Sequence, residues 1–123
     1  MKILAVDYGK KWVGLAISDD ECQLAFAYKT LINDKKLFSI LNEIIKKEEI
    51  YKIVIGLPLN KQMKPTAQTA ETKKWAEELI KKVALPLDFE NEIFTSKAAD
   101  KLGVKNQHAA AAAIFLQSYL DRM

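Results

Sequence analysis

One stretch near the start of the chain decides the fold: Ile3-Leu4-Ala5-Val6-Asp7-Tyr8-Gly9-Lys10-Lys11-Trp12-Val13-Gly14-Leu15-Ala16-Ile17-Ser18-Asp19. Only a few residues separate its two apolar runs, which leaves no room for a crossover helix. The two runs must therefore form an antiparallel hairpin. Asp7 ends the first run and opens a turn that carries glycine and two lysines. A carboxylate in that setting suits a metal ion and a phosphate better than it suits packing.

Length and composition predict one globular domain over residues 1–123. Half of the 123 residues are hydrophobic, which is enough for a core at this size. The net charge of +3 says little about partners. Cys22 is the only cysteine, which excludes an internal disulfide and a cysteine-based zinc site. We expect a cytoplasmic protein, because no room precedes the first motif for a signal peptide and no apolar run is long enough to span a bilayer.

The hydrophobic patterns predict five strands and four helices. The first three strands follow one another through short turns, and each of the last two follows a helix. The chain therefore predicts an α/β fold, with a five-stranded mixed sheet and helices on both faces. The predicted strands are 2–7, 13–18, 24–31, Tyr51–Leu57 and Leu85–Glu92. The predicted helices are one capped by Asn33 or Asp34, one over 66–83, a short one from Thr95 or Ser96 to Gly103, and one over 106–120.

The order of the elements also predicts where a ligand binds. In sheets of this kind, ligands gather where neighbouring connections leave in opposite directions. Here that point lies between the first strand and the strand Tyr51–Leu57. Asp7 lies near it, and the loop from Gly56 to Asn60 opens there.

Four motifs in register give the chain a family resemblance. They are Asp7-Tyr8-Gly9 with Gly14-Leu15-Ala16-Ile17-Ser18-Asp19, Val54-Ile55-Gly56-Leu57-Pro58-Leu59-Asn60, Asn91-Glu92-Ile93-Phe94-Thr95-Ser96, and His108 through Ala112 to Ile114-Phe115-Leu116-Gln117-Ser118-Tyr119-Leu120. Together they resemble the signatures of the YqgF/RuvX family across nearly the whole chain. The resemblance implies a ribonuclease-H-like fold. It also implies a nuclease for Holliday-junction-like substrates, associated with maturation of the 5′ end of 16S ribosomal RNA.

The resemblance further implies which residues carry the reaction. Asp7 and Glu92 occupy two of the family's three acidic positions, and His108 stands where the family has an aspartate. Asn91 and Ile93 replace a usual aspartate and a usual arginine. We expect nucleic-acid contacts from residues in the turns and loops beside the acids, namely Gly9, Lys10, Lys11, Asn60 and Thr95.

The predicted chemistry is metal-dependent phosphodiester hydrolysis. Carboxylates commonly hold the divalent ions that carry out this reaction. We therefore expect Asp7, Glu92 and His108 to be metal ligands and catalytic residues, with Mg²⁺ or Mn²⁺ as cofactor. Oxygen ligands suit Mg²⁺, whereas an imidazole favours Mn²⁺. The structural alternatives are that Asp7 caps its turn, that Glu92 is an ordinary strand-end residue, and that His108 is an ordinary residue of the first helical turn.

Two other functions compete with a nuclease. One is a nucleic-acid-binding module of the same fold with weakened catalysis, which His108 and Ile93 favour. The other is an actin-like or sugar-kinase-like ATPase, whose phosphate loop also has an aspartate and a glycine after the first strand. Such ATPases need two domains, so this reading ranks last. The expected partner is nucleic acid, RNA before DNA, with no membrane, and the chain is expected to be a monomer or a two-fold dimer.

Overall fold

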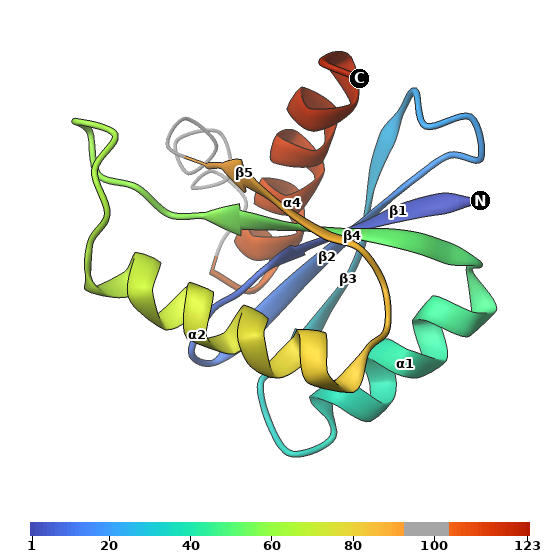
Figure 1. Cartoon of the computed structure of the whole chain (residues 1–123), viewed down its shortest axis with the longest axis horizontal. Helices are drawn as coiled ribbons and strands as arrows, with labels where there is room; N and C mark the ends of the chain where they lie inside the picture. The colour runs from blue at the N-terminus through green and yellow to red at the C-terminus, as the bar shows by residue number, and fades with distance from the viewer. Residues whose placement is uncertain (93–103) are drawn as a thin grey trace.

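The computed structural model describes residues 1–92 and 104–123 (Figure 1). Its elements are β1 (Lys2–Asp7), β2 (Trp12–Ser18), β3 (Ala25–Ile32), α1 (Leu37–Lys47), β4 (Ile50–Leu57), α2 (Ala67–Lys82), β5 (Leu87–Asn91) and α4 (Val104–Asp121). The five predicted strands are all present. The short helix predicted from Thr95 or Ser96 to Gly103 lies outside the described residues.

The strands form one five-stranded sheet in the order β3-β2-β1-β4-β5. β1 pairs antiparallel with β2 and parallel with β4, and β4 pairs parallel with β5. The predicted hairpin and the mixed sheet are therefore confirmed. In the hairpin, Asp7 lies directly opposite Gly14. This pairing places the carboxylate and the glycine on the same face of the sheet.

Helices cover both faces of the sheet, as predicted (Figure 1). Side chains alternate along β1, so Leu4 and Val6 pack in one core cluster with α1 and α2. Ile3 and Ala5 point the other way and pack against α4. Asp7 continues this second set and therefore faces α4.

The two helices on the first face begin in different ways. α2 begins after Thr66, which caps it together with Thr69 in a reciprocal capping box, so the predicted start is confirmed. α1 begins at Leu37 after Lys36, so the predicted cap at Asn33 or Asp34 is wrong. The Asp34 carboxylate instead accepts a hydrogen bond from the Lys36 amide at 2.9 Å. This bond closes a turn before the helix.

No helix in the part of the chain that the structure describes is long and apolar enough to cross a membrane.

Candidate functional site

The site forms where the end of β1 meets the first turns of α4. Asp7 is 5% exposed, and its Oδ2 lies 2.7 Å from Nδ1 of His108, although 101 residues separate the two in sequence. The strand end brings the carboxylate to this point because β1 runs through the middle of the sheet. The start of α4 brings the imidazole from above the same face.

Glu92 joins this pair from the same end of the sheet, two strands away from β1. It directly follows β5, and its amide donates to the Leu57 carbonyl oxygen at 3.2 Å. Its carboxyl group is hydrogen-bonded to that of Asp7. The structure thus brings together Asp7, Glu92 and His108, which come from three separate segments of the chain.

Burial sets the charges of the three groups. Desolvation raises the pKa of Asp7 to about 6, although the hydrogen bond with Glu92 lowers it in part. Desolvation, together with the negative charge of Asp7, raises the pKa of Glu92 to about 10. Near neutral pH, Glu92 therefore keeps its proton and donates it to the ionised Asp7. Burial lowers the pKa of His108, so its neutral ring donates from Nδ1 to Asp7.

Three glycines make room for these side chains. A Cβ on Gly14 would lie 2.0 Å from the backbone carbon of His108 and 2.2 Å from the Ala109 nitrogen. A Cβ on Gly9 would lie 2.8 Å from the His108 ring, and one on Gly56 would lie 2.4 Å from Oε2 of Glu92. Gly14 therefore allows α4 to approach the sheet, and the other two leave space for the site's own side chains.

The predicted nucleic-acid contacts lie around this cluster, but several already have partners. Lys10 lies 3.6 Å from Oε1 of Glu71, and Lys11 lies over the ring of Trp12 at 5.5 Å. The side-chain oxygen of Asn60 accepts hydrogen bonds from the backbone amides of Gln62 and Lys64, so this atom stabilises its own turn. Gly9 lies at the His108 ring, as described above. Thr95 lies outside the described residues.

Two features, one beside the site and one at the far end of α4, were missed from the sequence. The ring of Tyr8 stacks on that of Trp75 at 4.9 Å, beside a hollow between the β1–β2 turn and α2. An aromatic residue directly after Asp7 was the available signal. Glu90 is 5% exposed and pairs with Arg122 at 2.8 Å. The sequence offers no signal for its burial, because alternating acids in Asp88-Phe89-Glu90 are typical of a solvent-facing strand surface.

The described residues contain no preformed metal site. In residues 1–92 and 104–123, no group of three or more His, Cys, Asp or Glu side chains is arranged to hold a metal ion. Asp7 is instead bonded to both Glu92 and His108. Two carboxyl groups and an imidazole are nevertheless donors of the kind that bind divalent ions.

The whole chain matches known proteins. The family model described as "RuvX: Holliday junction resolvase" matches residues 1–122. A protein of Rickettsia rickettsii (strain Sheila Smith), named as a candidate pre-16S rRNA nuclease, is 37% identical over 97% of this chain and 85% of its own. One of the same name from Maridesulfovibrio salexigens is 38% identical over 99% of both chains. These matches confirm the family resemblance seen in the sequence.

Solved structures show the same fold at low sequence identity. RuvC of T. thermophilus in complex with a Holliday junction substrate has a TM-score of 0.62 at 14% identity, covering 99% of this chain and 95% of that one. The Fowlpox virus resolvase in complex with Holliday junction DNA has a TM-score of 0.62 at 13% identity, covering 99% and 98%. The fold is therefore ribonuclease-H-like, as in these resolvases. Family model, relatives and fold agree, and the chain belongs to the RuvX family of nucleases.

Proposed function

We propose that Asp7, Glu92 and His108 carry out the nuclease reaction of this chain on structured nucleic acid, with RNA preferred over DNA. The names of the relatives indicate precursor 16S rRNA as the substrate, and the family description indicates a Holliday-junction-like molecule as the alternative. Within the precursor, we propose the 5′ end as the site of cleavage. One observation carries the proposal: the two carboxyl groups and the imidazole converge from three segments. A four-way junction would in addition require a two-fold dimer.

The donor set fits a divalent ion in kind. Asp7, Glu92 and His108 would hold Mg²⁺ or Mn²⁺, which when bound supplies an activated water and stabilises the charge on the phosphate. Binding requires Glu92 to give up the proton that it shares with Asp7. An imidazole in place of a third carboxylate is a softer donor, so Mn²⁺ is the expected preference.

The protein's own groups orient the reaction. The Nδ1–H of His108 holds the Asp7 carboxylate in one orientation. Nε2 of the same ring faces the Gly9 turn and can accept a proton there. Lys10, Lys11, Gly9, Asn60 and Thr95 would contact phosphates or the sugar of the bound strand.

One observation favours the second candidate, a nucleic-acid-binding module with weakened catalysis. The Asp7 carboxylate is hydrogen-bonded to both His108 and Glu92, so this acid has polar partners without an ion. The two candidates differ in whether added metal produces cleavage.

Cleavage assays with a precursor 16S rRNA 5′-end fragment and a four-way DNA junction, each in Mg²⁺ and in Mn²⁺, test the proposal. We expect faster cleavage with Mn²⁺, and a loss of roughly 100-fold or more in Asp7→Asn and Glu92→Gln. His108→Asp should restore activity with Mg²⁺. Asp20→Asn is the matched control, because Asp20 is exposed and its ion pair is with the N-terminus. Binding without cleavage in either metal would support the binding module instead.

A further inference from the structure

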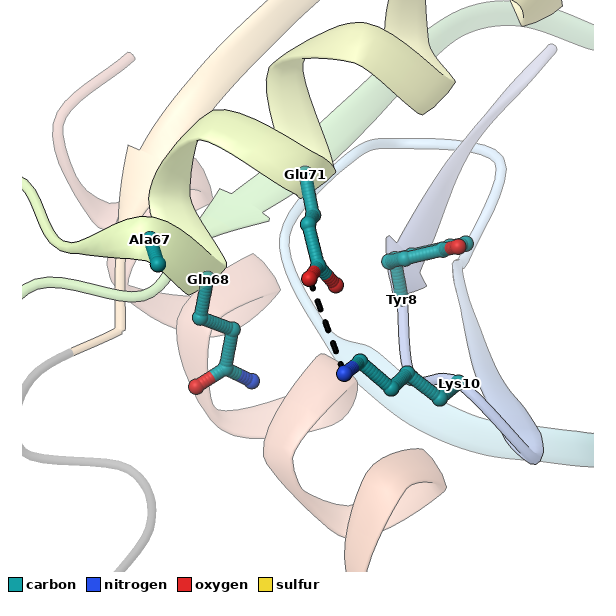
Figure 2. A pocket seen from close by; sticks show the side chains of 6 residues that line it. Tyr8, Lys10, Ala67, Gln68 and Glu71 are labelled. Carbon is teal, nitrogen blue, oxygen red and sulfur yellow. Dashed lines mark ion pairs between the residues drawn. The ribbon is translucent and has the colours of Figure 1, made fainter.

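A hollow of about 400 Å³ opens beside the site, between the β1–β2 turn and the first turns of α2 (Figure 2). Its lining residues are Tyr8, Gly9, Lys10, Ala67, Gln68 and Glu71. A shallower hollow of about 280 Å³ shares Tyr8 and Glu71 with it and continues along α2. Gly9 lines the first hollow, and a Cβ on Gly9 would lie 2.8 Å from the His108 ring, so the hollow and the site meet at this turn. A strand whose phosphate reaches the site can therefore place its next nucleotide in the hollow. Its volume is within the range of small-ligand sites.

The apolar wall of the hollow is held rigidly. The ring of Tyr8 stacks on Trp75 at 4.9 Å, and Trp75 stacks on Phe38 at 5.9 Å. Trp75 is 8% exposed and belongs to the core, so the pile of three rings is anchored. An aromatic ring fixed in this way offers a nucleobase a stacking surface with little loss of side-chain entropy.

The polar wall of the hollow is formed by the side-chain amide of Gln68 and the carboxylate of Glu71. Gln68 and Glu71 lie one turn apart on α2, and Figure 2 shows Glu71 and Lys10 pointing toward each other across the hollow. Their ion pair spans 3.6 Å, and the two side chains are 82% and 45% exposed, so it is weak and a ligand can replace it. The Glu71 carboxylate repels phosphate, which argues that a base rather than the backbone enters. Lys10, once released, is left free for a phosphate.

Building on the proposed function, we propose that this hollow receives an unpaired base next to the cleaved phosphate and prefers guanine. The Watson–Crick edge of guanine presents two adjacent N–H donors, which match the two oxygens of one carboxylate. Uracil would place carbonyl oxygens against the same carboxylate. Tyr8 stacks on any base, so Glu71 sets the preference and Tyr8 contributes general affinity.

Binding without metal tests the inference separately from cleavage. The probes are hairpin RNAs that differ only in one unpaired nucleotide, G, A, C or U, in a short 5′ overhang, and the affinities are measured in a chelator. We expect the G probe to bind roughly tenfold more tightly than the U probe, as for one bidentate base contact. Glu71→Gln should reduce this ratio to nearly one, and Tyr8→Leu should weaken binding of all four probes.

The matched control is Glu77→Gln, on the same helix and exposed but outside the hollow; it should leave the ratio unchanged. Equal binding of the four probes by the wild type, or a G-to-U ratio that survives Glu71→Gln, would overturn the inference while leaving the nuclease proposal intact. Cleavage of the substrates in Mn²⁺ by a protein that binds none of the four probes in the chelator would do the same. If none of the probes binds and no substrate is cleaved, the proposed function fails with it.

Discussion

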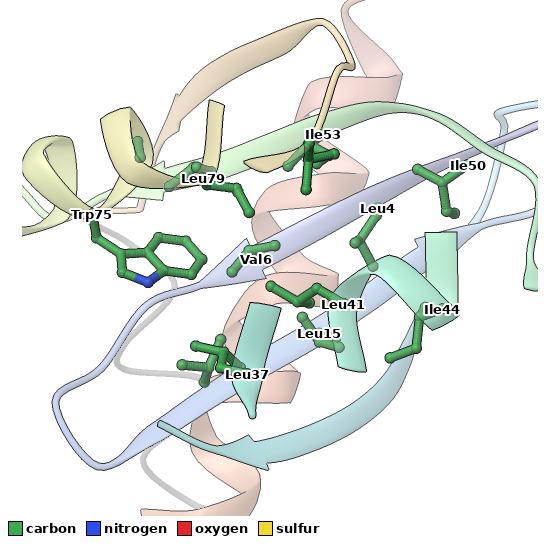
Figure 3. Packing of buried hydrophobic residues seen from close by; sticks show 14 residues of the cluster. Leu4, Val6, Leu15, Leu37, Leu41, Ile44, Ile50, Ile53, Trp75 and Leu79 are labelled. Atoms are coloured by element: carbon green, nitrogen blue, oxygen red, sulfur yellow. The ribbon is translucent and has the colours of Figure 1, made fainter. Parts of the chain in front are cut away.

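The two faces of the sheet differ in their share of small residues. The face under α1 and α2 is packed with large side chains, among them Leu37, Leu41, Trp75 and Leu79 (Figure 3). The face under α4 also buries large side chains, such as Phe115 and Leu116, but it has Ala5, Ala16 and Ala112 in its core and Gly14 and Gly56 on the strands. Large side chains hold a helix away from the sheet, whereas small ones let its backbone come close. The site lies on the small-residue face, where the start of α4 reaches the strand ends.

We infer from this contrast that the face under α1 and α2 contributes most of the stability and that the face under α4 positions the site. Mutations on the two faces should then separate stability from activity. The variants below are ordered by the expected change in the free energy of unfolding, which urea titration measures.

Leu41→Ala should give the largest effect. Leu41 is 1% exposed in the core of the first face, and truncating such a leucine costs about 2–5 kcal/mol. Cleavage per folded molecule should stay unchanged at low temperature. Ser39→Ala, exposed on the same helix, is the control. If Leu41→Ala loses activity while it is still folded, the first face also positions the site, and the proposed separation of roles between the two faces is wrong.

Gly14→Ala should come next, at about 1–3 kcal/mol, because the new methyl group meets backbone atoms of His108 and Ala109. Activity should fall as well, since the imidazole is displaced from Asp7. Gly56→Ala sharpens the test, because its methyl group meets side-chain atoms of Glu92 and Phe115 and no backbone atom is among its three nearest neighbours. It should therefore cost less stability than Gly14→Ala while still reducing cleavage. Equal stability losses in the two variants would contradict the backbone argument.

Arg122→Met should cost about 1–2 kcal/mol, because it leaves the buried Glu90 without its charged partner. The double variant Glu90→Gln with Arg122→Met should recover most of that loss. This ion pair joins the end of α4 to β5. The loss of unfolding free energy in the single variant therefore measures how much the packing of α4 on the sheet depends on this polar contact. No loss in the single variant would show that solvent replaces the arginine.

Glu92→Gln should have the smallest effect on the free energy of unfolding. Unlike the variants above, it should raise the stability instead of lowering it. Burial raises the pKa of Glu92 from 4.5 to about 10. Between these values the unfolded chain loses the proton and the folded chain keeps it, so the metal-free protein loses stability as pH rises. Glutamine removes this dependence and should stabilise the protein at pH 8 by on the order of 1 kcal/mol, but not at pH 4. Glu77→Gln is the control, and an unchanged pH slope in Glu92→Gln would refute the buried proton.

The sheet was predictable because its strands are apolar runs separated by unmistakable turns. The convergence of Asp7 and Glu92 followed from the strand order, since both stand at the same end of the sheet. The hydrogen bond between His108 and Asp7 was not predictable, because it depends on how closely α4 approaches Gly14. The prediction for the cap of α1 was wrong because an aspartate can cap a turn as well as a helix, and Asp34 closes the turn before the helix. The proposed roles of the site residues stay predictions.

The strand order also has a consequence for how the site opens. Asp7 ends the central strand β1, whereas Glu92 follows β5, which lies at the edge of the described sheet and pairs with β4 alone. Edge strands open by local fluctuations well below the free energy of global unfolding, and central strands do not. The two acids therefore belong to units that exchange amide hydrogens at different rates. A ligand that bridges them fastens the edge strand to the centre, so slower hydrogen exchange in β5 would report its binding before any reaction occurs.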